Sequence, residues 1–253
     1  MSSEADRNVI VVTGGSRGIG AATCRLAAHA GYDVVVNYAS DAASAETVVA
    51  DCAASGVRAM AIGARVEEEA SVAAMFERVI GEFGAPSVLV NNAGILEQQM
   101  RLDEMAVDRW RRVFDVNVFG TFLCSREAAR RMSTRHGGSG GVIVNVSSAA
   151  SYLGSPFEYV DYAASKGAVD TMTIGLGREL ADEGVRVVAV RPGVVHTEIH
   201  ASGGEPDRVD RVAAGVPMRR GGQPDEVART ILWLASGEAS YVTATTVDVS
   251  GGR

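Results

Sequence analysis

The chain has 253 residues, of which 47% are hydrophobic and 22% charged, and its formal net charge is −7. These proportions suit a globular domain with one sizeable core, and the acidic balance argues against a general nucleic-acid-binding surface. No apolar run reaches the length of a membrane span, and the polar start lacks a signal-peptide core. We therefore expect a cytoplasmic protein with no nucleic-acid or membrane partner.

Short apolar runs alternate with helical stretches along the whole chain. The expected strands are 9–12, 34–36, 57–62, 88–90, 142–146, 185–190 and 245–249. Helices are expected over 19–30, up to 55, over 70–83, over 107–135 with an interruption near Asn117, up to 181, around 208, and over 225–235. Strands that are apolar throughout and separated by helices indicate a parallel sheet covered on both faces. The sequence therefore predicts an α/β fold, a single doubly wound Rossmann domain over 1–253 with a seven-stranded parallel sheet.

A glycine-rich loop joins the first expected strand to the first helix. It reads Thr13-Gly14-Gly15-Ser16-Arg17-Gly18-Ile19-Gly20. Glycines let the backbone approach a pyrophosphate closely, and free amides at a helix N-terminus attract anions. No Gly-Lys-Ser/Thr follows, which excludes a Walker phosphate loop. The loop therefore predicts dinucleotide binding.

The end of the second expected strand bears on the choice of dinucleotide. An acidic residue about 20 positions beyond the loop would bind the ribose hydroxyls of NAD. The strand instead ends in Asn37 and Tyr38, and the nearest acid, Asp41, lies further on at a position expected to be exposed. The guanidinium of Arg17 suits a 2′-phosphate, the alternative being a solvated loop arginine. We predict a preference for NADP(H) over NAD(H).

Tyr162 and Lys166 lie four residues apart in an expected helix and so share one of its faces. Tyrosine is a poor acid–base catalyst at neutral pH because its pKa is about 10. Lowering that pKa to about 7 needs roughly 4 kcal/mol, about what one unit charge supplies from about 4 Å at an effective dielectric near 20. The pair is a candidate for passing a proton to or from a substrate oxygen, although this spacing also arises by chance.

Together with other motifs, these residues resemble the short-chain dehydrogenase/reductase family, classical type. The motifs occur in order along nearly the whole chain: Thr13 to Gly20, Asn91-Asn92-Ala93-Gly94, Asn117, Ser147-Ser148, Tyr162-xxx-Lys166 and Arg191-Pro192-Gly193. Within the family, the chain is similar to 3-oxoacyl carrier-protein reductases and to glucose 1-dehydrogenase-like members. The resemblance implies an oxidoreductase that acts on a carbonyl or a secondary alcohol with a nicotinamide cofactor.

The resemblance also assigns roles to individual residues. Tyr162 would donate the proton in reduction and accept it in oxidation, while Lys166 would lower the pKa of Tyr162 and hold the nicotinamide ribose. Ser148 would bind the substrate oxygen, and Asn117 would organise a water chain through Lys166. The residues expected to bind the cofactor are Gly14, Ser16, Arg17, Gly18, Ile19, Gly20, Asn37, Tyr38, Val66, Asn91, Ala93, Gly94, Tyr162, Lys166, Pro192, Gly193, Val195 and Thr197.

The sequence departs from the family pattern in two places. Ser148 and Tyr162 lie 14 residues apart, one more than is usual, so we expect the extra residue to bulge the loop 151–161 beside the substrate. Arg65 stands where the family usually has an aspartate that contacts adenine. A guanidinium cannot accept that hydrogen bond, so Arg65 either weakens adenine binding or stacks on the ring.

The polar segment 194–218 is long enough to act as a mobile substrate loop. His196 and His200 lie four apart within it, but no convincing third ligand accompanies them, so no metal site is predicted. The arginines at positions 109, 111 and 112 are expected on a solvated helix face.

The apolar C-terminal end resembles the family's subunit-contact region, which implies a homotetramer. The alternative to an enzyme is a non-catalytic dinucleotide-binding sensor or scaffold on the same fold. The set of Ser148, Tyr162 and Lys166 argues against that alternative, because a sensor has no need of a proton relay.

Overall fold

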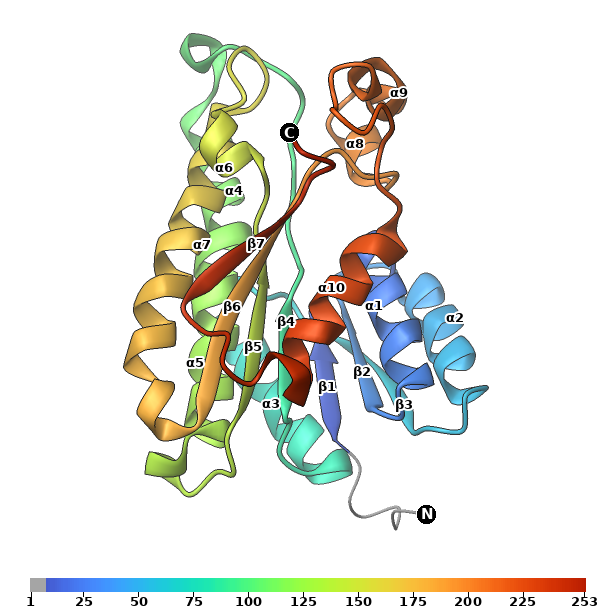
Figure 1. The fold of residues 1–253 in the computed structure, drawn as a ribbon, viewed down its shortest axis with the longest axis vertical. Helices are drawn as coiled ribbons and strands as arrows, with labels where there is room; N and C mark the ends of the chain where they lie inside the picture. The colour runs from blue at the N-terminus through green and yellow to red at the C-terminus, as the bar shows by residue number, and fades with distance from the viewer. Residues whose placement is uncertain (1–7) are drawn as a thin grey trace.

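Seven parallel strands form one sheet through the centre of the molecule (Figure 1). In this computed structural model, residues 8–253 are described. The strand order is β3-β2-β1-β4-β5-β6-β7, so the direction of winding reverses between β1 and β4. The bounds are β1 Val9–Val12, β2 Asp33–Tyr38, β3 Ala59–Gly63, β4 Val88–Asn91, β5 Gly141–Val146, β6 Val185–Pro192 and β7 Thr245–Val249. The predicted α/β Rossmann fold with a seven-stranded parallel sheet is confirmed.

Helices cover both faces of this sheet because its central strands, such as β1 and β4, bury side chains on both sides. In β1, Ile10 and Val12 belong to one buried cluster while Val9 and Val11 belong to the other. The first cluster is covered by α1 (Gly18–His29), α2 (Ala42–Ala53) and α10 (Pro224–Ala235). The second is covered by α3 (Glu69–Phe83), α5 (Gly120–Met132) and α7 (Val160–Glu179).

The helix predicted over 107–135 is interrupted at the expected place. It consists of α4 (Val107–Phe114), a π-helical turn (Asp115–Phe119) and α5. Asn117 is fully buried in the turn, where its side-chain amide accepts a hydrogen bond from Ile95 N–H at 2.8 Å and donates one to the Ile95 carbonyl at 3.1 Å. Single π-helical turns occur mainly at functional sites. This one fastens the helix to the chain that leaves β4.

The short elements gather at the carboxyl ends of the strands, at the top of Figure 1. They are α6 (Ala150–Leu153), α8 (Ile199–Ser202) and α9 (Arg208–Ala213). The segment expected to be a substrate loop, 194–218, thus contains two short helices, and its mobility stays a prediction. Single 3-10 turns lie elsewhere, at Leu102–Glu104, Thr134–His136, Ala181–Glu183 and Gly237–Ala239.

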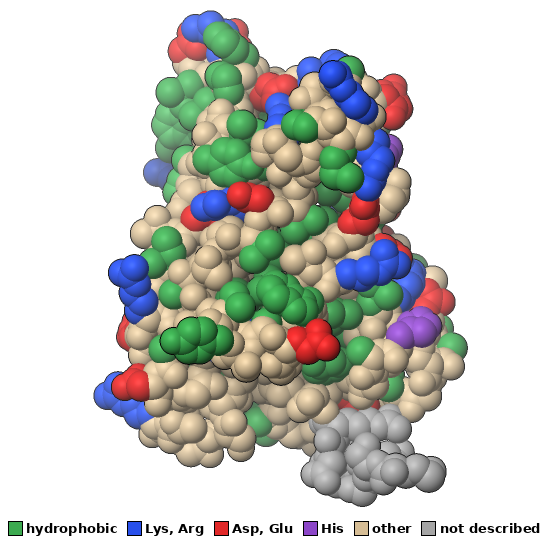
Figure 2. Space-filling model, viewed as in Figure 1, with side chains coloured by type: hydrophobic (Ala, Val, Ile, Leu, Met, Phe, Trp, Pro, Cys, Tyr) green, Lys and Arg blue, Asp and Glu red, His purple; other side chains and the backbone are tan. Residues whose placement is uncertain are grey.

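Charged side chains of both signs are interspersed over the face shown in Figure 2. Ion pairs join neighbouring elements, such as the pair of Arg25 with Asp51 at 2.8 Å. Between residues 8 and 253, none of the helices combines the length and the apolar character needed to cross a membrane.

Candidate active site

A cavity of about 870 Å³ opens where the strands end, a size typical of ligand and cofactor sites. The loops after β1 to β6 all contribute to its wall. Most of the predicted site residues line it: Gly14, Ser16, Arg17, Gly18, Ile19, Asn37, Tyr38, Val66, Ala93, Gly94, Ser148, Tyr162, Lys166, Pro192, Gly193, Val195 and Thr197. Three others, Gly20, Asn91 and Asn117, lie behind the lining.

The glycine loop is held open by contacts that leave no room for side chains. Gly14 has a φ of +60°, and a Cβ on it would lie 2.9 Å from the Cα of Ala93. A Cβ on Gly20 would overlap the carbonyl oxygen of Gly14. Both positions therefore require glycine, the first for its backbone conformation and the second for the close approach of α1 to the loop.

Asn92 fixes this loop to the end of β4. Its side-chain amide donates to the carbonyls of Thr13 and Gly14, both at 2.9 Å, and its backbone N–H donates to the Thr13 hydroxyl at 3.0 Å. The sequence-based set of site residues omits Asn92, although the doubled asparagine is a visible signal. Asn91, which that set includes, instead donates to Asn145 and Ser125 at 2.9 Å inside the sheet.

The end of β2 holds the groups that bear on ribose recognition. Asp41 caps α2, accepting the Ser44 N–H at 3.0 Å and the Ser44 hydroxyl at 2.7 Å. These bonds, and then the charge of Arg17, hold the pKa of Asp41 below its usual value. Arg17 itself is exposed at the start of α1 and lines the same end of the cavity. Both side chains line the cavity, but the Asp41 carboxylate is engaged with Ser44 of its own helix.

Arg65 also lines this end, but its guanidinium is already engaged. It pairs with Glu67 at 2.6 Å and with Glu68 at 2.9 Å. The side chain is 61% exposed, so these pairs contribute little to stability. Weaker adenine binding and stacking on the ring both remain open for Arg65.

The other end of the cavity contains the tyrosine and lysine of α7. The Lys166 ammonium is buried, donates to the Val146 carbonyl at 2.8 Å and lies 5.7 Å from the centre of the Tyr162 ring. A Cβ on Gly94 would lie 3.5 Å from the Lys166 nitrogen, so glycine keeps this space open. Tyr162 is half-buried and hydrogen-bonded with Ser148. Three of the predicted catalytic side chains, from the loop after β5 and from α7, thus line one end of the cavity.

Asn117 contacts α7 through Ser165, which the sequence did not indicate as a site residue. Its amide donates to the Ser165 hydroxyl at 3.1 Å, and Ser165 donates to the carbonyl of Tyr162 at 2.7 Å. All of these groups except Tyr162 are fully buried. Asn117 therefore supports the turn of α7 that carries Tyr162. Its predicted role in a water chain stays a prediction.

Burial is the largest influence on the pKa values of Tyr162 and Lys166. It raises the pKa of Tyr162 above its usual value, and the hydrogen bond with Ser148 only partly opposes this effect. It lowers the pKa of Lys166 to about 8, against the attraction of Asp170. The expectation that a nearby ammonium lowers the pKa of Tyr162 is not met in this structure. The ammonium donates its hydrogen bond to the Val146 carbonyl, and burial is the largest influence on the pKa of Tyr162.

We predict that Lys166 titrates near pH 8 in the protein without dinucleotide. Lys166 is the single lysine of the chain, so labelling with [13C]lysine gives one side-chain signal to follow by NMR. Between pH 8 and 10 the unfolded chain binds more protons at this residue than the native state does, because the native pKa is about 8 and the ordinary value 10.5. Stability should therefore rise by about 2 kcal/mol relative to Lys166→Met over that range. A midpoint above 10 would contradict the prediction.

Arg109 is buried, so the prediction of a solvated face is wrong for this residue and holds for Arg111 and Arg112. Its guanidinium donates to both carboxylate oxygens of Asp161, at 2.7 and 3.1 Å, and to the carbonyl of Gln98. Asp161 immediately precedes Tyr162 in the first turn of α7. One arginine thus joins α4, the chain after β4 and the helix of Tyr162.

The loop between Ser148 and Tyr162 contains two residues with unusual backbone conformations, while the bulge beside the substrate stays a prediction. Ser155 and Phe157 have φ values of +44° and +64°, a region that residues other than glycine rarely adopt. The Phe157 side chain is 72% exposed. The same loop carries Glu158, which pairs with Arg208 of α9 at 2.6 Å.

The two histidines of segment 194–218 do not form a metal site. His200 has its Nε2 at 2.9 Å from the Val195 carbonyl. Nowhere in residues 8–253 do three or more His, Cys, Asp or Glu side chains gather as metal ligands would.

Comparison with known proteins identifies the family. A family model described as enoyl-(acyl carrier protein) reductase matches residues 14–253. The uncharacterized oxidoreductase YgfF of Escherichia coli (strain K12) is 53% identical over 245 residues, 97% of this chain and 99% of the relative. The chain belongs to the short-chain dehydrogenase/reductase family, classical type. It is an oxidoreductase of that family, which confirms the resemblance drawn from the motifs.

Other members extend this relationship to solved structures. Glucose 1-dehydrogenase 2 of Bacillus subtilis (strain 168) is 36% identical over 242 residues, 96% of this chain and 93% of the relative. A short-chain dehydrogenase of Burkholderia cenocepacia, solved with NADP, is 33% identical with a TM-score of 0.89 over 97% of both chains. A 3-ketoacyl-(acyl-carrier-protein) reductase of Brucella melitensis, solved with NADH, is 31% identical with a TM-score of 0.90 over 97% of this chain and 98% of that one.

Proposed function

We propose that this protein is an NADP(H)-dependent oxidoreductase that transfers a hydride between nicotinamide and a carbonyl or secondary alcohol, with Tyr162 as general acid and base. One observation carries the proposal: Ser148, Tyr162 and Lys166 meet in the same cavity that the glycine loop enters from the other end. A non-catalytic sensor on this fold would need the glycine loop but not the three polar side chains.

The cavity wall fits a dinucleotide. Glycines at positions 14, 18 and 20 keep the backbone accessible after β1, and Gly14 and Gly18 both have positive φ. The start of α1 offers free amides to a pyrophosphate. The expected nicotinamide end is lined by Pro192, Gly193, Val195 and Thr197. Known relatives solved with NADP and with NADH support a nicotinamide cofactor.

The protein's own groups would manage the proton and the developing charge. A bound nicotinamide supplies or accepts the hydride, so the protein must provide a proton donor at the substrate oxygen. The Tyr162 hydroxyl would donate that proton in reduction, and Ser148 would hydrogen-bond the same oxygen. The ammonium of Lys166, if turned from the Val146 carbonyl into the cavity, would favour the phenolate that remains and would hold the nicotinamide ribose.

We predict that Arg17 selects the phosphorylated cofactor. The wild-type protein should bind NADPH more tightly than NADH, because Arg17 lines the ribose end and Asp41 is engaged with Ser44. Arg17→Ala should weaken NADPH binding about tenfold or more and leave NADH binding nearly unchanged, as expected for one charge-assisted contact. Fluorescence titration measures both constants.

The matched control for Arg17 is Arg25→Ala, which removes an exposed arginine of the same helix that pairs with Asp51. It should alter neither constant. Equal or tighter binding of NADH by the wild-type protein would contradict the cofactor preference.

The reaction is tested by following NADPH oxidation, and NADP⁺ reduction in the reverse direction, across acyl thioesters, sugars, steroids, quinones and simple ketones. Turnover of at least one class that depends on Tyr162 supports the proposed function. Tight dinucleotide binding without turnover of any class would favour the sensor or scaffold.

The remaining features of the proposal concern the whole molecule. We propose a homotetramer, in keeping with large apolar side chains left exposed on this chain, Phe119 at 57%, Phe122 at 50% and Trp233 at 42%. Light scattering of the purified protein measures this state. A cytoplasmic location, a single domain over 1–253 and a substrate loop over 194–218 are proposed from the sequence.

A further inference from the structure

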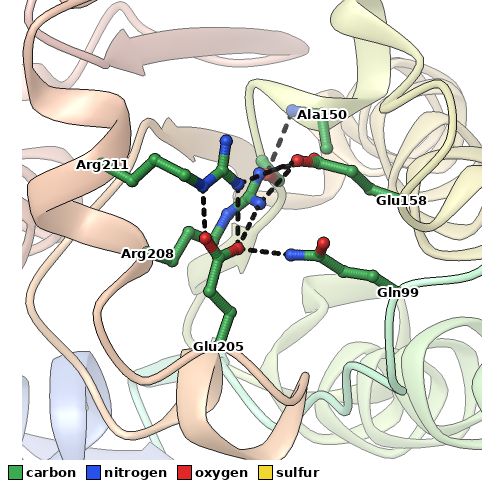
Figure 3. A network of polar contacts seen from close by, with 7 residues as sticks. Gln99, Ala150, Glu158, Glu205, Arg208 and Arg211 are labelled. Atoms are coloured by element: carbon green, nitrogen blue, oxygen red, sulfur yellow. Dashed lines mark hydrogen bonds and ion pairs between the residues drawn. The ribbon is translucent and has the colours of Figure 1, made fainter.

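Four charged side chains form a cluster at the substrate end of the cavity: Glu158, Glu205, Arg208 and Arg211 (Figure 3). Arg208 donates to both carboxylate oxygens of Glu158, at 2.8 and 2.6 Å, and to Glu205 at 3.3 Å. Arg211 donates to Glu158 at 3.2 Å and also pairs with Glu205. Two positive and two negative charges thus compensate each other.

Arg208 is placed close to the proposed chemistry. Its side chain is only 9% exposed, and both Arg208 and Glu158 line the cavity. The guanidinium lies 4.9 Å from the centre of the Tyr159 ring, which stands edge-on to the Tyr162 ring at a centre-to-centre distance of 6.1 Å. A buried cation therefore lies one aromatic ring away from the proposed proton donor.

Such a guanidinium would be a strong binding site for a substrate carboxylate if it were free, because its planar fork matches both carboxylate oxygens. Here Glu158 already fills the fork. Burial works against the charge on Glu158, yet its bonds with Arg208 and Arg211 hold its pKa below the usual value. A substrate carboxylate would have to displace an ionised side chain and lie next to its charge. The cluster is charge-balanced and offers a substrate carboxylate no unpaired cation, so an anionic substrate would add a third carboxylate to two guanidinium groups.

Other cationic side chains near this end of the cavity do not replace Arg208 as a binding group for a substrate carboxylate. The Lys166 ammonium donates to the Val146 carbonyl, and burial lowers the pKa of His200, which keeps its ring neutral at pH 7. Arg253 lines the rim of the cavity and is exposed. Its contribution stays the same in every variant used below.

We infer that Glu158 is a specificity-determining residue: by occupying the guanidinium of Arg208, it restricts the cavity to neutral carbonyl and alcohol substrates and rejects those that carry a carboxylate near the reacting carbon. This inference rests on the proposed function. It predicts that removal of the Glu158 charge turns Arg208 into a carboxylate-binding group beside Tyr162.

The test compares each keto acid with its methyl ester, which differ in charge and little in shape. Suitable pairs are pyruvate, acetoacetate and levulinate with their esters, because the carboxylate lies progressively further from the reacting carbonyl. The variants are Glu158→Gln, which removes the carboxylate that fills the fork of Arg208, and the double variant Glu158→Gln with Arg208→Gln. Both variants loosen the contact between α9 and the loop 151–161. In the first, Glu205 alone balances Arg208 and Arg211, which leaves a surplus of one positive charge, whereas in the second Arg211 and Glu205 balance each other.

The wild-type protein should favour the ester over the acid in kcat/KM for every pair that it turns over. Glu158→Gln should raise the acid-to-ester ratio about tenfold to a hundredfold for at least one pair, the size expected for one charge-assisted carboxylate contact. The double variant should not raise the ratio. The inference is overturned if wild-type protein uses acid and ester equally well, or if both variants raise the ratio equally, since loosening alone would then explain the effect.

Calorimetric titration of the same acids into the protein with NADP⁺ gives a second readout that does not need turnover. Binding of an acid to Glu158→Gln but not to wild type or the double variant supports the inference even if no ester is reduced. Absence of turnover with every neutral carbonyl would count against the proposed function alone, whereas unchanged acid binding in Glu158→Gln would count against the role of Glu158.

Discussion

Replacement of Tyr162 by Phe is expected to lower turnover by about 10²–10⁴-fold, the usual contribution of one positioned general acid or base. The substitution removes a single oxygen from a half-buried ring that lines the cavity. Its main hydrogen-bonding partner, Ser148, also accepts from the N–H of Ala150 at 3.1 Å and keeps that bond. The backbone supports of the site, through Asn117 and Ser165, do not involve the hydroxyl.

The affinity for NADPH should therefore change by no more than a few-fold in Tyr162→Phe, so that kcat falls while dinucleotide binding persists. Tyr241→Phe is the matched control, because Tyr241 is fully exposed and loses the same atom. Turnover and dinucleotide titration of the three proteins separate the outcomes. If turnover persists unchanged in Tyr162→Phe, the assignment of Tyr162 as general acid and base is wrong.

The local features of this chain were readable from its sequence because they depend on neighbours in the chain. The run Val9–Val12 is apolar throughout since both faces of β1 are buried. The loop from Thr13 to Gly20 needs glycine at the positions where the backbone turns left-handed or approaches α1 closely. The break near Asn117 coincides with a polar amide between Val116 and Val118, and the structure has its π-helical turn there.

What the sequence could not indicate depends on partners far along the chain. Arg109 looks like its exposed neighbours Arg111 and Arg112 until Asp161, 52 residues later, is brought against it. Ser165 is recognisable as part of the site only because it accepts a hydrogen bond from Asn117, 48 residues before it. The prediction of a lowered pKa for Tyr162 was wrong for the same reason. That pKa depends on burial and on the direction in which the Lys166 ammonium points. Spacing along a helix specifies neither.

The buried pair of Arg109 and Asp161 leads to the second large effect. Their side chains are 7% and 2% exposed, and they share two hydrogen bonds. Removing one partner of such a pair leaves an uncompensated buried charge, which typically costs about 3–5 kcal/mol. Arg109→Met should therefore lower the free energy of unfolding by about that amount. Adding Asp161→Asn to it should recover part of the loss, because no buried charge then remains. Urea denaturation measures all three values.

The same variants should also move the pH dependence of reduction in opposite directions, because Asp161 directly precedes Tyr162. With Tyr162 as the proposed general acid, reduction needs the protonated tyrosine, so its rate should fall as pH rises through the pKa of Tyr162. An unpaired Asp161 carboxylate in Arg109→Met disfavours the phenolate and moves this fall to higher pH. An unpaired Arg109 in Asp161→Asn favours the phenolate and moves it to lower pH. The double variant should lie between the two. A loss of stability alone would lower the rates of all variants without shifting their pH profiles in this order. Profiles that run parallel would therefore show that Arg109 and Asp161 act only in folding.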